Sequence, residues 1–535
     1  MITHYAMNSN QITSTTALEK SFRKYLFDSR RNRLTMFIIG AVIVIQFIIF
    51  KFFYPYAGYI HGDSFLYLDA AYKNQDINFY LVGYSKFLRL FSVFLNSDIA
   101  LAGFQYVLIQ SSALLFLFTL FYFYRPGKLM QVFLLAFMVL NPLFLYMANM
   151  VSSDGFFLAL SFIWFSLLIW IIHRPSNYLV AAHALVLFMT FTVRYNALIY
   201  PLITIAAFGL SPLRLRTKII GILGGFLLIG AFVLHTGNRY KTFMGVWQFS
   251  PFSGWQMTNN AMYAYRYVDK VDRVPVPARF RGLDNMIRTY FDSTRDVKKH
   301  PQEAILASTV YMWTPGLPLF KYRDLQFTKD TSASEFKRWA TMGPLYADYG
   351  TYIIKQYPWH YIRYFLWYNA QKYYAPPIEF LEEYNGGSDY VEPIAKSWFR
   401  YKSTKVTARV KDLKVNMLGF YPTLSGIMNV LFFSSLLCFI ILRGFRNRTL
   451  FRKGVLLMTA MWLLNAVFSI FSTSAALRFL AFPVLLMCTF ALLLIEWLWR
   501  NGGNGPSKEL QFGEGNQDSI QVIDNSSKSN VLIRS

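Results

Sequence analysis

Two aspartates and two arginines lie where this chain is otherwise almost free of charge. Asp63 and Asp154 lie between long apolar stretches, and Arg194 and Arg478 each stand beside such a stretch with no other charged residue nearby. An ionised group close to hydrocarbon is costly unless it has a partner or a task, so these four side chains are the first candidates for chemistry. A carboxylate can act as a general base, and a guanidinium group can hold a phosphate with paired hydrogen bonds.

Asp63 lies in the run HGDSFLYLDAA, residues 61–71, shortly after the first apolar stretch. The spacing of the apolar residues in this run indicates a helix along the membrane surface, with Asp63 or Ser64 at its N-cap. Helix capping and acid–base chemistry are therefore both open for Asp63. Asp69 belongs to the same run, but its spacing from Asp63 does not place the two carboxylates on one helix face, so it is a weak partner.

Asp154 ends the run MVSSD in a short turn between two apolar stretches. It can cap the helix that follows and also face a substrate, since the two roles are compatible. Arg194 and Arg478 lie at the ends of two later apolar stretches. A lone arginine there can reach lipid headgroups with its flexible stem, but two such arginines favour a phosphate-binding role, for which guanidinium geometry is suited.

The elements that must position these residues are apolar stretches of about 20 residues, the length that crosses a bilayer as a helix. The chain of 535 residues is 55% hydrophobic and only 15% charged. Soluble domains average about 25% charged residues, so a large soluble enzyme is excluded. We predict an all-α polytopic membrane protein with about ten transmembrane helices. They lie near 34–53, 100–122, 129–148, 155–172, 178–193, 197–212, 218–235, 424–442, 454–472 and 479–498.

Lysine and arginine residues predict the orientation of these helices. They gather before the first helix and in every second connection after it, for example at Arg214, Arg216 and Lys218. The short connections on the other side carry only Arg194 and Arg478. The positive-inside rule therefore places both termini in the cytoplasm and the candidate residues on the other face. The formal net charge of +25 follows from this topology, so we expect membrane lipids as partners and no nucleic acid.

The largest connection, 236–420, predicts a mainly helical non-cytoplasmic domain. It holds 26 Lys and Arg against 16 Asp and Glu, and its stretch 351–374 mixes aromatic and basic residues, as an interfacial helix or an ordinary amphipathic helix does. Cys438 and Cys488 lie inside apolar stretches, which excludes a disulfide framework. The predicted parts are a cytoplasmic segment 1–33, helices one to seven within 34–235 with an outer loop at 54–99, the domain 236–420, helices eight to ten within 421–500, and a disordered cytoplasmic tail 501–535.

Several short motifs contain these candidates. They are HGDS at 61–64 followed by Tyr67-Leu68, GYSKF at 83–87, NP at 141–142 leading to SSD at 152–154, FTVR at 191–194 and LRF at 477–479. The order of these motifs along the chain, and the membrane face on which we expect them, resemble those of the GT-C superfamily of membrane glycosyltransferases. The resemblance covers roughly 34–235 and 420–500. Two prolines of the family pattern are missing, because Ser85 replaces one and Tyr195 follows Arg194. The segment 236–420 resembles no part of the family.

The resemblance implies an integral membrane glycosyltransferase that uses a polyprenyl-phosphate-linked sugar, as protein mannosyltransferases and aminoarabinose transferases do. Asp63 would be the general base for an acceptor hydroxyl, with inversion at the sugar, and Arg194 and Arg478 would bind the donor phosphate. The remaining candidates would be Asp154 and Asp69, which would orient the acceptor or hold a cation, and His61 and Tyr84, which would contact substrate. The acceptor would be a glycolipid, a glycan or a protein, at the periplasmic face of a bacterial inner membrane. No nucleotide is required, and the use of a divalent metal ion as a cofactor stays open.

Three other classes of protein stay open for this sequence. An O-antigen polymerase or ligase would place its arginines and a histidine in the segment 236–420. A transporter or flippase would couple charges inside its helices to the movement of ions. A structural protein of a membrane complex would leave the one-sided set of aspartates and arginines unexplained. Substitution of Asp63 separates these alternatives, because only the glycosyltransferase should lose its transfer activity.

Overall fold

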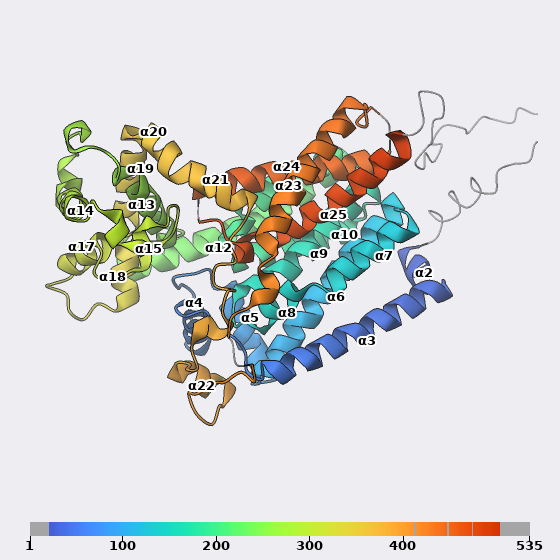
Figure 1. Ribbon diagram of the computed structural model, residues 1–535, viewed down its shortest axis with the longest axis horizontal. Helices are drawn as coiled ribbons and strands as arrows, with labels where there is room; N and C mark the ends of the chain where they lie inside the picture. Colours follow the sequence, from blue (N-terminus) through green and yellow to red (C-terminus); the bar gives the residue numbers. More distant parts are fainter. Residues whose placement is uncertain (1–20, 411–412, 447–448, 473, 503–535) are drawn as a thin grey trace, which may run out of the picture.

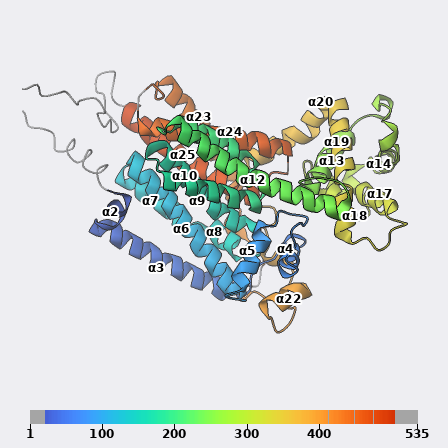
Figure 2. The ribbon, with the colours of Figure 1, turned by 180° about the vertical axis from the view of Figure 1, so that it is seen from behind.

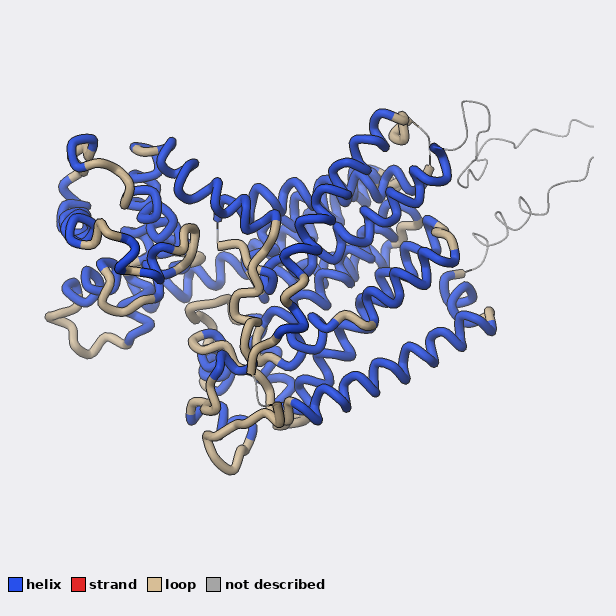
Figure 3. The backbone as a smooth tube through the Cα atoms, in the orientation of Figure 1, coloured by secondary structure: helices blue, strands red, loops and turns tan. Residues whose placement is uncertain are grey.

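The computed structural model describes residues 21–410, 413–446, 449–472 and 474–502. Residues 503–535 of the predicted tail and residues 1–20 of the predicted cytoplasmic segment lie outside the described part. Within the described ranges the chain is helical, and β pairing is confined to isolated bridges such as the one between Gly58 and Met150. Figure 3 shows long loop segments around α4 (Asp63–Tyr72), α5 (Gly83–Ser92) and α22 (Pro393–Phe399), at one end of the helical bundle.

Among the described residues, eight helical segments are long and apolar enough to cross a membrane. They are α3 (Arg30–Phe53), α6 (Asp98–Tyr124), the pair α7 and α8 (Lys128–Val139 and Pro142–Asn149), α9 (Ser153–His173), α12 (Leu215–Met244), α23 (Tyr421–Ile441), α24 (Leu450–Ser472) and α25 (Leu477–Gly502). Two shorter apolar helices, α10 (Asn177–Val193) and α11 (Tyr200–Leu210), complete the bundle in Figure 1. An all-α membrane protein is therefore confirmed, and the crossing of the two shorter helices stays a prediction.

The third predicted span is interrupted between α7 and α8. Pro142 is at the first turn of α8, and a proline cannot donate the backbone hydrogen bond that would continue α7. The side chain of Asn141 caps the new helix by accepting a hydrogen bond from Leu143 N at 3.0 Å. The chain therefore changes direction before it reaches Asp154.

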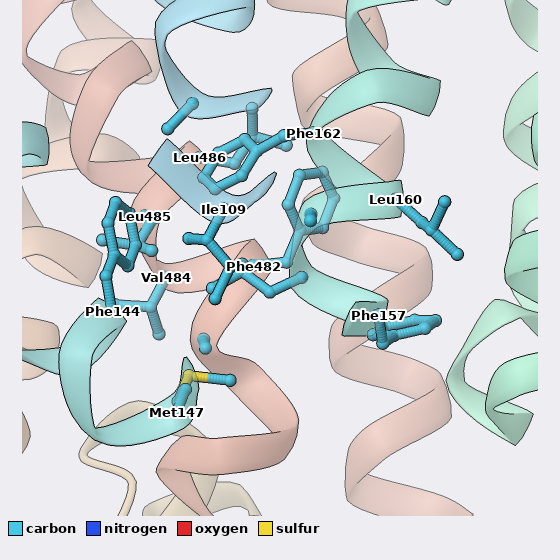
Figure 4. Close-up of a cluster of buried hydrophobic side chains, with 14 of the residues drawn as sticks. Ile109, Phe144, Met147, Phe157, Leu160, Phe162, Phe482, Val484, Leu485 and Leu486 are labelled. Carbon is cyan, nitrogen blue, oxygen red and sulfur yellow. The ribbon is translucent and has the colours of Figure 1, made fainter. Parts of the chain in front are cut away.

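A dense apolar core holds α9 against α6, α8 and α25. Figure 4 shows Ile109 of α6, Phe144 and Met147 of α8, Phe162 of α9 and Phe482 of α25 within one cluster. The rings of Phe162 and Phe482 meet edge to face with their centroids 5.4 Å apart. Burial of such rings is the main source of stability in a packed core. The packing fixes the beginning of α9 close to the beginning of α25, which is where Asp154 and Arg478 lie.

The predicted outer loop 54–99 contains two short helices, α4 (Asp63–Tyr72) and α5 (Gly83–Ser92). Their apolar residues, including Leu68, Tyr84 and Leu88, are buried in the core of the bundle. Backbone hydrogen bonds tie the loop before α4 to the chain before α9: Gly58 N donates to Asn149 O at 2.9 Å. The first outer loop is therefore a fixed part of the bundle end.

The helix α12 leaves the bundle and leads into a separate helical domain, as Figures 1 and 2 show from opposite sides. This domain has a core of its own around Trp255, Trp339 and Tyr346. Its central helices α13 (Pro251–Tyr265) and α19 (Gly343–Gln356) touch at their backbones, since a Cβ on Gly254 would lie 1.9 Å from Gly343 O. The other helices here are α14 (Arg281–Ser293), α15 (Pro301–Ala304), α16 (Val310–Trp313), α17 (Pro318–Gln326), α18 (Glu335–Thr341) and α20 (Pro358–Tyr361). The next helix, α21 (Trp367–Tyr374), packs on the bundle, where Asn369 Nδ2 donates to Ser469 O of α24 at 3.0 Å.

The segment 236–420 divides between two cores, although the sequence predicts one domain. Leu381, Val391 and Phe399 belong to the core of the bundle, together with α22 (Pro393–Phe399). The hydroxyls of Tyr401 and Tyr59 lie 2.8 Å apart and join this segment to the first outer loop. Within 236–420, buried residues up to Phe365 therefore contribute to the core of the helical domain, and buried residues from Leu381 to Leu418 contribute to the core of the bundle.

Candidate active site

The chain turns sharply into α4 at Gly62. The φ angle of Gly62 is 89°, in a region that glycine occupies without steric cost. Gly62 is the N-cap residue of α4, and no side chain caps the helix. The expected capping by Asp63 or Ser64 is therefore wrong: Asp63 is the first helical residue, and the Ser64 hydroxyl accepts a hydrogen bond from Ile60 N at 2.9 Å.

The Asp63 carboxylate is left available for two long-range partners. Tyr80 donates its phenolic hydrogen to Oδ1 at 2.6 Å, and Arg478 donates from Nη1 to Oδ2 at 2.9 Å. Burial, with the negative charge of Asp63 as a further cause, raises the pKa of Tyr80 well above its ordinary value. The phenol therefore stays protonated and remains a donor to Asp63 over the whole physiological range of pH.

Asp154 lies in the first turn of α9, whose N-cap is Ser152. The expected capping role therefore belongs to Ser152, whose hydroxyl also donates to Asp154 Oδ2. The carboxylate of Asp154 forms ion pairs with both arginines. Arg194 binds Oδ1, and Arg478 approaches Oδ2 at 3.4 Å.

Both guanidinium groups pack on the ring of Phe479. The Cζ atoms of Arg194 and Arg478 lie 4.9 Å and 4.4 Å from its centroid. Phe380 covers Arg478 from another side at 4.3 Å. Such cation–π contacts are favourable and become stronger where water is excluded. The aromatic rings hold the two arginines in defined positions.

We call Asp63, Asp154, Arg194 and Arg478 the charged cluster. Two carboxylates and two guanidinium groups balance in formal charge, which offsets much of the cost of their burial. The side chains of Asp63 and Arg194 are 19% and 14% exposed, whereas those of Asp154 and Arg478 are 1% and 6% exposed. Asp63 and Arg194 are therefore the members that a substrate reaches first. Nε of Arg478 is buried and makes no hydrogen bond to any described residue, so one donor of the cluster is unused.

Three other candidates from the sequence have hydrogen-bond, ion-pair or ring partners outside the charged cluster. Asp69 pairs with Lys73 at 2.8 Å on the exposed side of α4. The ring of His61 lies against Phe65, with centroids 5.7 Å apart. Tyr84 is fully buried and donates a hydrogen bond to Gln105 Oε1 at 3.0 Å, so it supports the packing of α5.

Tyr80, Phe380 and Phe479 are members of the site that the sequence did not single out. Tyr80 is one of 36 tyrosines and belongs to none of the motifs. Phe479 lies within the motif LRF, but its role comes from its place between two arginines. Phe380 lies in the segment 236–420, and only the packing of that segment on the bundle brings it to Arg478.

No group of three or more His, Cys, Asp and Glu side chains suited to a metal ion occurs in the described part of the chain. Asp63 and Asp154 already have cationic partners, so their carboxylates need no metal ion for charge balance in this arrangement. The structure thus offers one carboxylate that a hydroxyl group can reach, next to guanidinium groups suited to an oxyanion.

Comparison with protein-family models, curated proteins and solved structures finds no match for the chain.

Proposed function

We propose that this chain is an integral membrane glycosyltransferase of the GT-C type. It moves a sugar from a polyprenyl-phosphate donor to an acceptor hydroxyl on the non-cytoplasmic side of the membrane. One observation carries the proposal: Asp63 of α4 and Asp154 of α9 meet at the same guanidinium group, Arg478 of α25, with Arg194 beside them. Four motifs that are far apart in the sequence supply these residues, and each motif resembles one of that superfamily.

In the proposed reaction the acceptor oxygen attacks the anomeric carbon of the donor sugar. The bond from that carbon to the phosphate oxygen breaks, the acceptor proton passes to the Asp63 carboxylate, and polyprenyl phosphate leaves. A single displacement of this kind inverts the anomeric centre. The phosphate gains negative charge as it leaves, so Arg194 and Arg478 stabilise the transition state more than the bound donor.

The charged cluster also suggests how the enzyme acts when the donor arrives. Arg478 pairs with both Asp63 and Asp154. A donor phosphate that binds the arginines competes with Asp63 for their hydrogen bonds. Asp63 is then freer to accept a proton, while Asp154 keeps the arginines in place from its buried position.

The orientation in the membrane is part of this proposal. The positive-inside rule places the charged cluster on the non-cytoplasmic face, which would be the periplasmic face in a bacterial inner membrane. The acceptor would be a glycolipid, a glycan or a protein, and the domain around α13 and α19 lies beyond the same end of the bundle (Figure 1). We propose that this domain selects the acceptor.

A polymerase or ligase of the O-antigen type receives less support. Its chemistry would rest on arginines and a histidine of the segment 236–420. The buried arginines Arg266 and Arg323 in this segment pair with carboxylates of the same domain, at 2.6 Å for Arg266 with Glu303 and 2.7 Å for Arg323 with Asp324. The pair of Arg266 joins the end of α13 to α15, and Arg323 of α17 also pairs with Glu335 of α18, so both arginines hold helices of this domain together, which is a structural role.

The test uses purified protein in liposomes with radiolabelled polyprenyl-phosphate sugars and crude membrane acceptors. Asp63→Asn should lower transfer by at least about 100-fold, because the general base is removed. Asp69→Asn is the matched control, since it makes the same change on the exposed side of the same helix. Binding of the donor should persist in both variants. Transfer that survives Asp63→Asn would remove Asp63 from the chemistry and overturn this mechanism.

A further inference from the structure

One helical run joins the helical domain to the bundle. It consists of α20 (Pro358–Tyr361), a π-helical turn at Ile362–Leu366 and α21 (Trp367–Tyr374). Figure 1 shows α20 and α21 along the edge of the molecule, between the helical domain and the bundle. We call this run the joining helix. No step of the proposed reaction uses it.

The joining helix has a buried side and an exposed side. Residues that are four apart lie on the same side of a helix. The buried side has this spacing and is formed by Tyr361, Phe365 and Asn369. The exposed side has the same spacing and is formed by Trp359, Arg363, Trp367 and Gln371. We call these last four residues the exposed stripe.

Contacts with the bundle fix the level of the joining helix relative to the membrane. Tyr361 and Asn369 donate hydrogen bonds to carbonyl groups in the last turn of the span α24, at 3.2 Å and 3.0 Å. Further along, Tyr374 O accepts a hydrogen bond at 3.1 Å from Asn429 Nδ2, and Asn429 lies well inside the span α23. The joining helix therefore lies where these spans leave the hydrocarbon, and its end at Tyr374 is the deeper one.

The aromatic residues of the exposed stripe fit this level. Trp359 and Trp367 are 78% and 61% exposed, whereas Trp255 and Trp339 in the core of the helical domain are fully buried. An indole ring in water leaves a large apolar area hydrated, which is unfavourable. At the level of lipid headgroups the same ring places its apolar part among the lipids and keeps its N–H group hydrated, so tryptophan is enriched there. Two exposed tryptophans at this level therefore indicate lipid contact.

The charges of the joining helix suit phospholipid headgroups. The range 349–378 contains no Asp or Glu. Lys372 turns towards the protein, where its Nζ donates to Ala307 O at 3.0 Å. Arg363 is exposed beside the ring of Tyr364, and its guanidinium group forms no ion pair with any residue that the structure describes. A guanidinium group in this position can bind a lipid phosphate with paired hydrogen bonds.

We propose that the exposed stripe docks on the phospholipid headgroups of the membrane face that carries the charged cluster. The rings of Trp359 and Trp367 lie between the headgroups, and Arg363 binds a lipid phosphate. Of the two interpretations that the sequence leaves open for 351–374, this is the interfacial helix. The proposal does not depend on the transferase activity, because it needs only the spans and the joining helix.

Lipid docking of the joining helix would also steady the cover of the charged cluster. The chain reaches the cluster soon after α21: Leu477 N donates to Pro377 O at 2.8 Å, and the ring of Phe380 covers Arg478 at 4.3 Å. A joining helix held among the headgroups therefore gives Pro377 and Phe380 a fixed approach to Arg478.

A fluorescent label tests which medium surrounds the exposed stripe. The label is attached at Gln371→Cys in the full chain with Cys438→Ser, because Cys438 is exposed and Cys488 is buried. Gln371 belongs to the stripe, and its substitution leaves both tryptophans and Arg363 in place. The protein is placed in nanodiscs of phosphatidylglycerol that carries a nitroxide quencher near its headgroup. Iodide is the quencher in the water.

Two exposed valines provide the reference positions. Val467→Cys places the label on the exposed surface of the span α24, and Val271→Cys places it on the surface of the helical domain. We expect the label at Gln371→Cys to be quenched more by the nitroxide lipid, and less by iodide, than the label at Val271→Cys. Quenching equal to that at Val271→Cys would place the stripe in water and overturn the proposal. Shielding from both quenchers would show that protein covers the stripe, as a second copy of the chain would, and would also overturn it.

Arg363→Gln tests the contact with phosphate. The nitroxide lipid is titrated into detergent micelles of the protein labelled at Gln371→Cys, and the lipid fraction at half-maximal quenching measures its affinity. Loss of one basic residue at an anionic lipid surface should weaken binding about fivefold. Arg279→Gln is the matched control, because Arg279 is exposed on the helical domain and pairs with Asp348. Equal affinity in the two variants would overturn phosphate binding by Arg363.

Discussion

Asp63 and Arg478 form an ion pair of 2.9 Å although 415 positions separate them in the chain. Arg478 reaches Asp154 as well, at 3.4 Å, so one guanidinium group joins the beginnings of α4, α9 and α25. The three helices are packed by apolar cores that contain none of these charges. The two ion pairs of Arg478 therefore form only when the whole bundle is folded. Removal of Arg478 should lower both the stability of the protein and its transfer activity.

We expect Arg478→Gln to destabilise the protein by about 3–5 kcal/mol, because it leaves the buried Asp154 with one cationic partner fewer and Asp63 with none. Arg478→Lys keeps the positive charge and should recover part of this loss, but not the transfer activity, which needs the fixed fork of a guanidinium group. Unfolding free energies in detergent and transfer rates in liposomes measure the two effects.

Arg279→Gln is the control for this change. Arg279 is exposed and pairs at 2.9 Å with Asp348, which is also exposed, so its loss should cost less than about 1 kcal/mol. Equal stability of the Arg478→Gln and Arg279→Gln variants would mean that the buried ion pairs do not hold the three helices together.

The sequence was sufficient to predict the helical bundle and the four members of the charged cluster. Long apolar stretches set the spans, and charge is so rare near them that Asp63, Asp154, Arg194 and Arg478 could be selected by position alone. Their pairing could not be predicted, because it depends on how α9 packs against α25. The third span was predicted as unbroken from its apolar composition, which is similar on both sides of Pro142, although a proline inside a helical stretch is itself a signal for the break.

The partners of single side chains could not be predicted from the motifs. Asp69 and His61 lie in the same run as Asp63, and Tyr84 lies in the GYSKF motif, but the direction of a side chain depends on its helix face and its neighbours. Tyr84 points into the core, and Asp69 points to solvent, where it meets Lys73. Tyr80 belongs to a loop, and its hydroxyl reaches Asp63 only because α4 and α5 fold back on each other.

Arg194→Lys should weaken binding of polyprenyl phosphate by about tenfold or more. The lysine keeps the charge but loses the paired donors that match a phosphate, and it cannot bind Asp154 and a phosphate oxygen at the same time with fixed geometry. Binding of polyprenyl phosphate in nanodiscs measures the effect, and Arg279→Lys in the outer helical domain is the control. Unchanged affinity in Arg194→Lys would remove Arg194 from phosphate binding.

Tyr80→Phe should lower kcat by about tenfold and change KM little, because Tyr80 is a positioning residue that fixes one oxygen of Asp63. The pH dependence distinguishes this role from acid–base chemistry by Tyr80 itself. Its pKa is raised, so the phenol stays protonated and the wild-type rate should show no loss from its ionisation up to about pH 10. The basic limbs of the pH–rate profiles should therefore coincide in the wild type and in Tyr80→Phe. A basic limb that disappears in Tyr80→Phe would instead make Tyr80 a proton carrier.

Gly83→Ala should disturb the charged cluster from a distance. A Cβ on Gly83 would lie 2.5 Å from the backbone oxygen of Thr192, so α5 and the end of α10 must move apart. Arg194 follows Thr192 by two residues and would be displaced from Asp154. We therefore expect about tenfold weaker binding of polyprenyl phosphate and a lower melting temperature. Gly224→Ala is the matched control, because a Cβ on Gly224 of α12 has no neighbouring atom within 4 Å. If Gly83→Ala lowers the melting temperature but leaves donor binding at the level of Gly224→Ala, the position of Arg194 does not depend on the contact between α5 and α10.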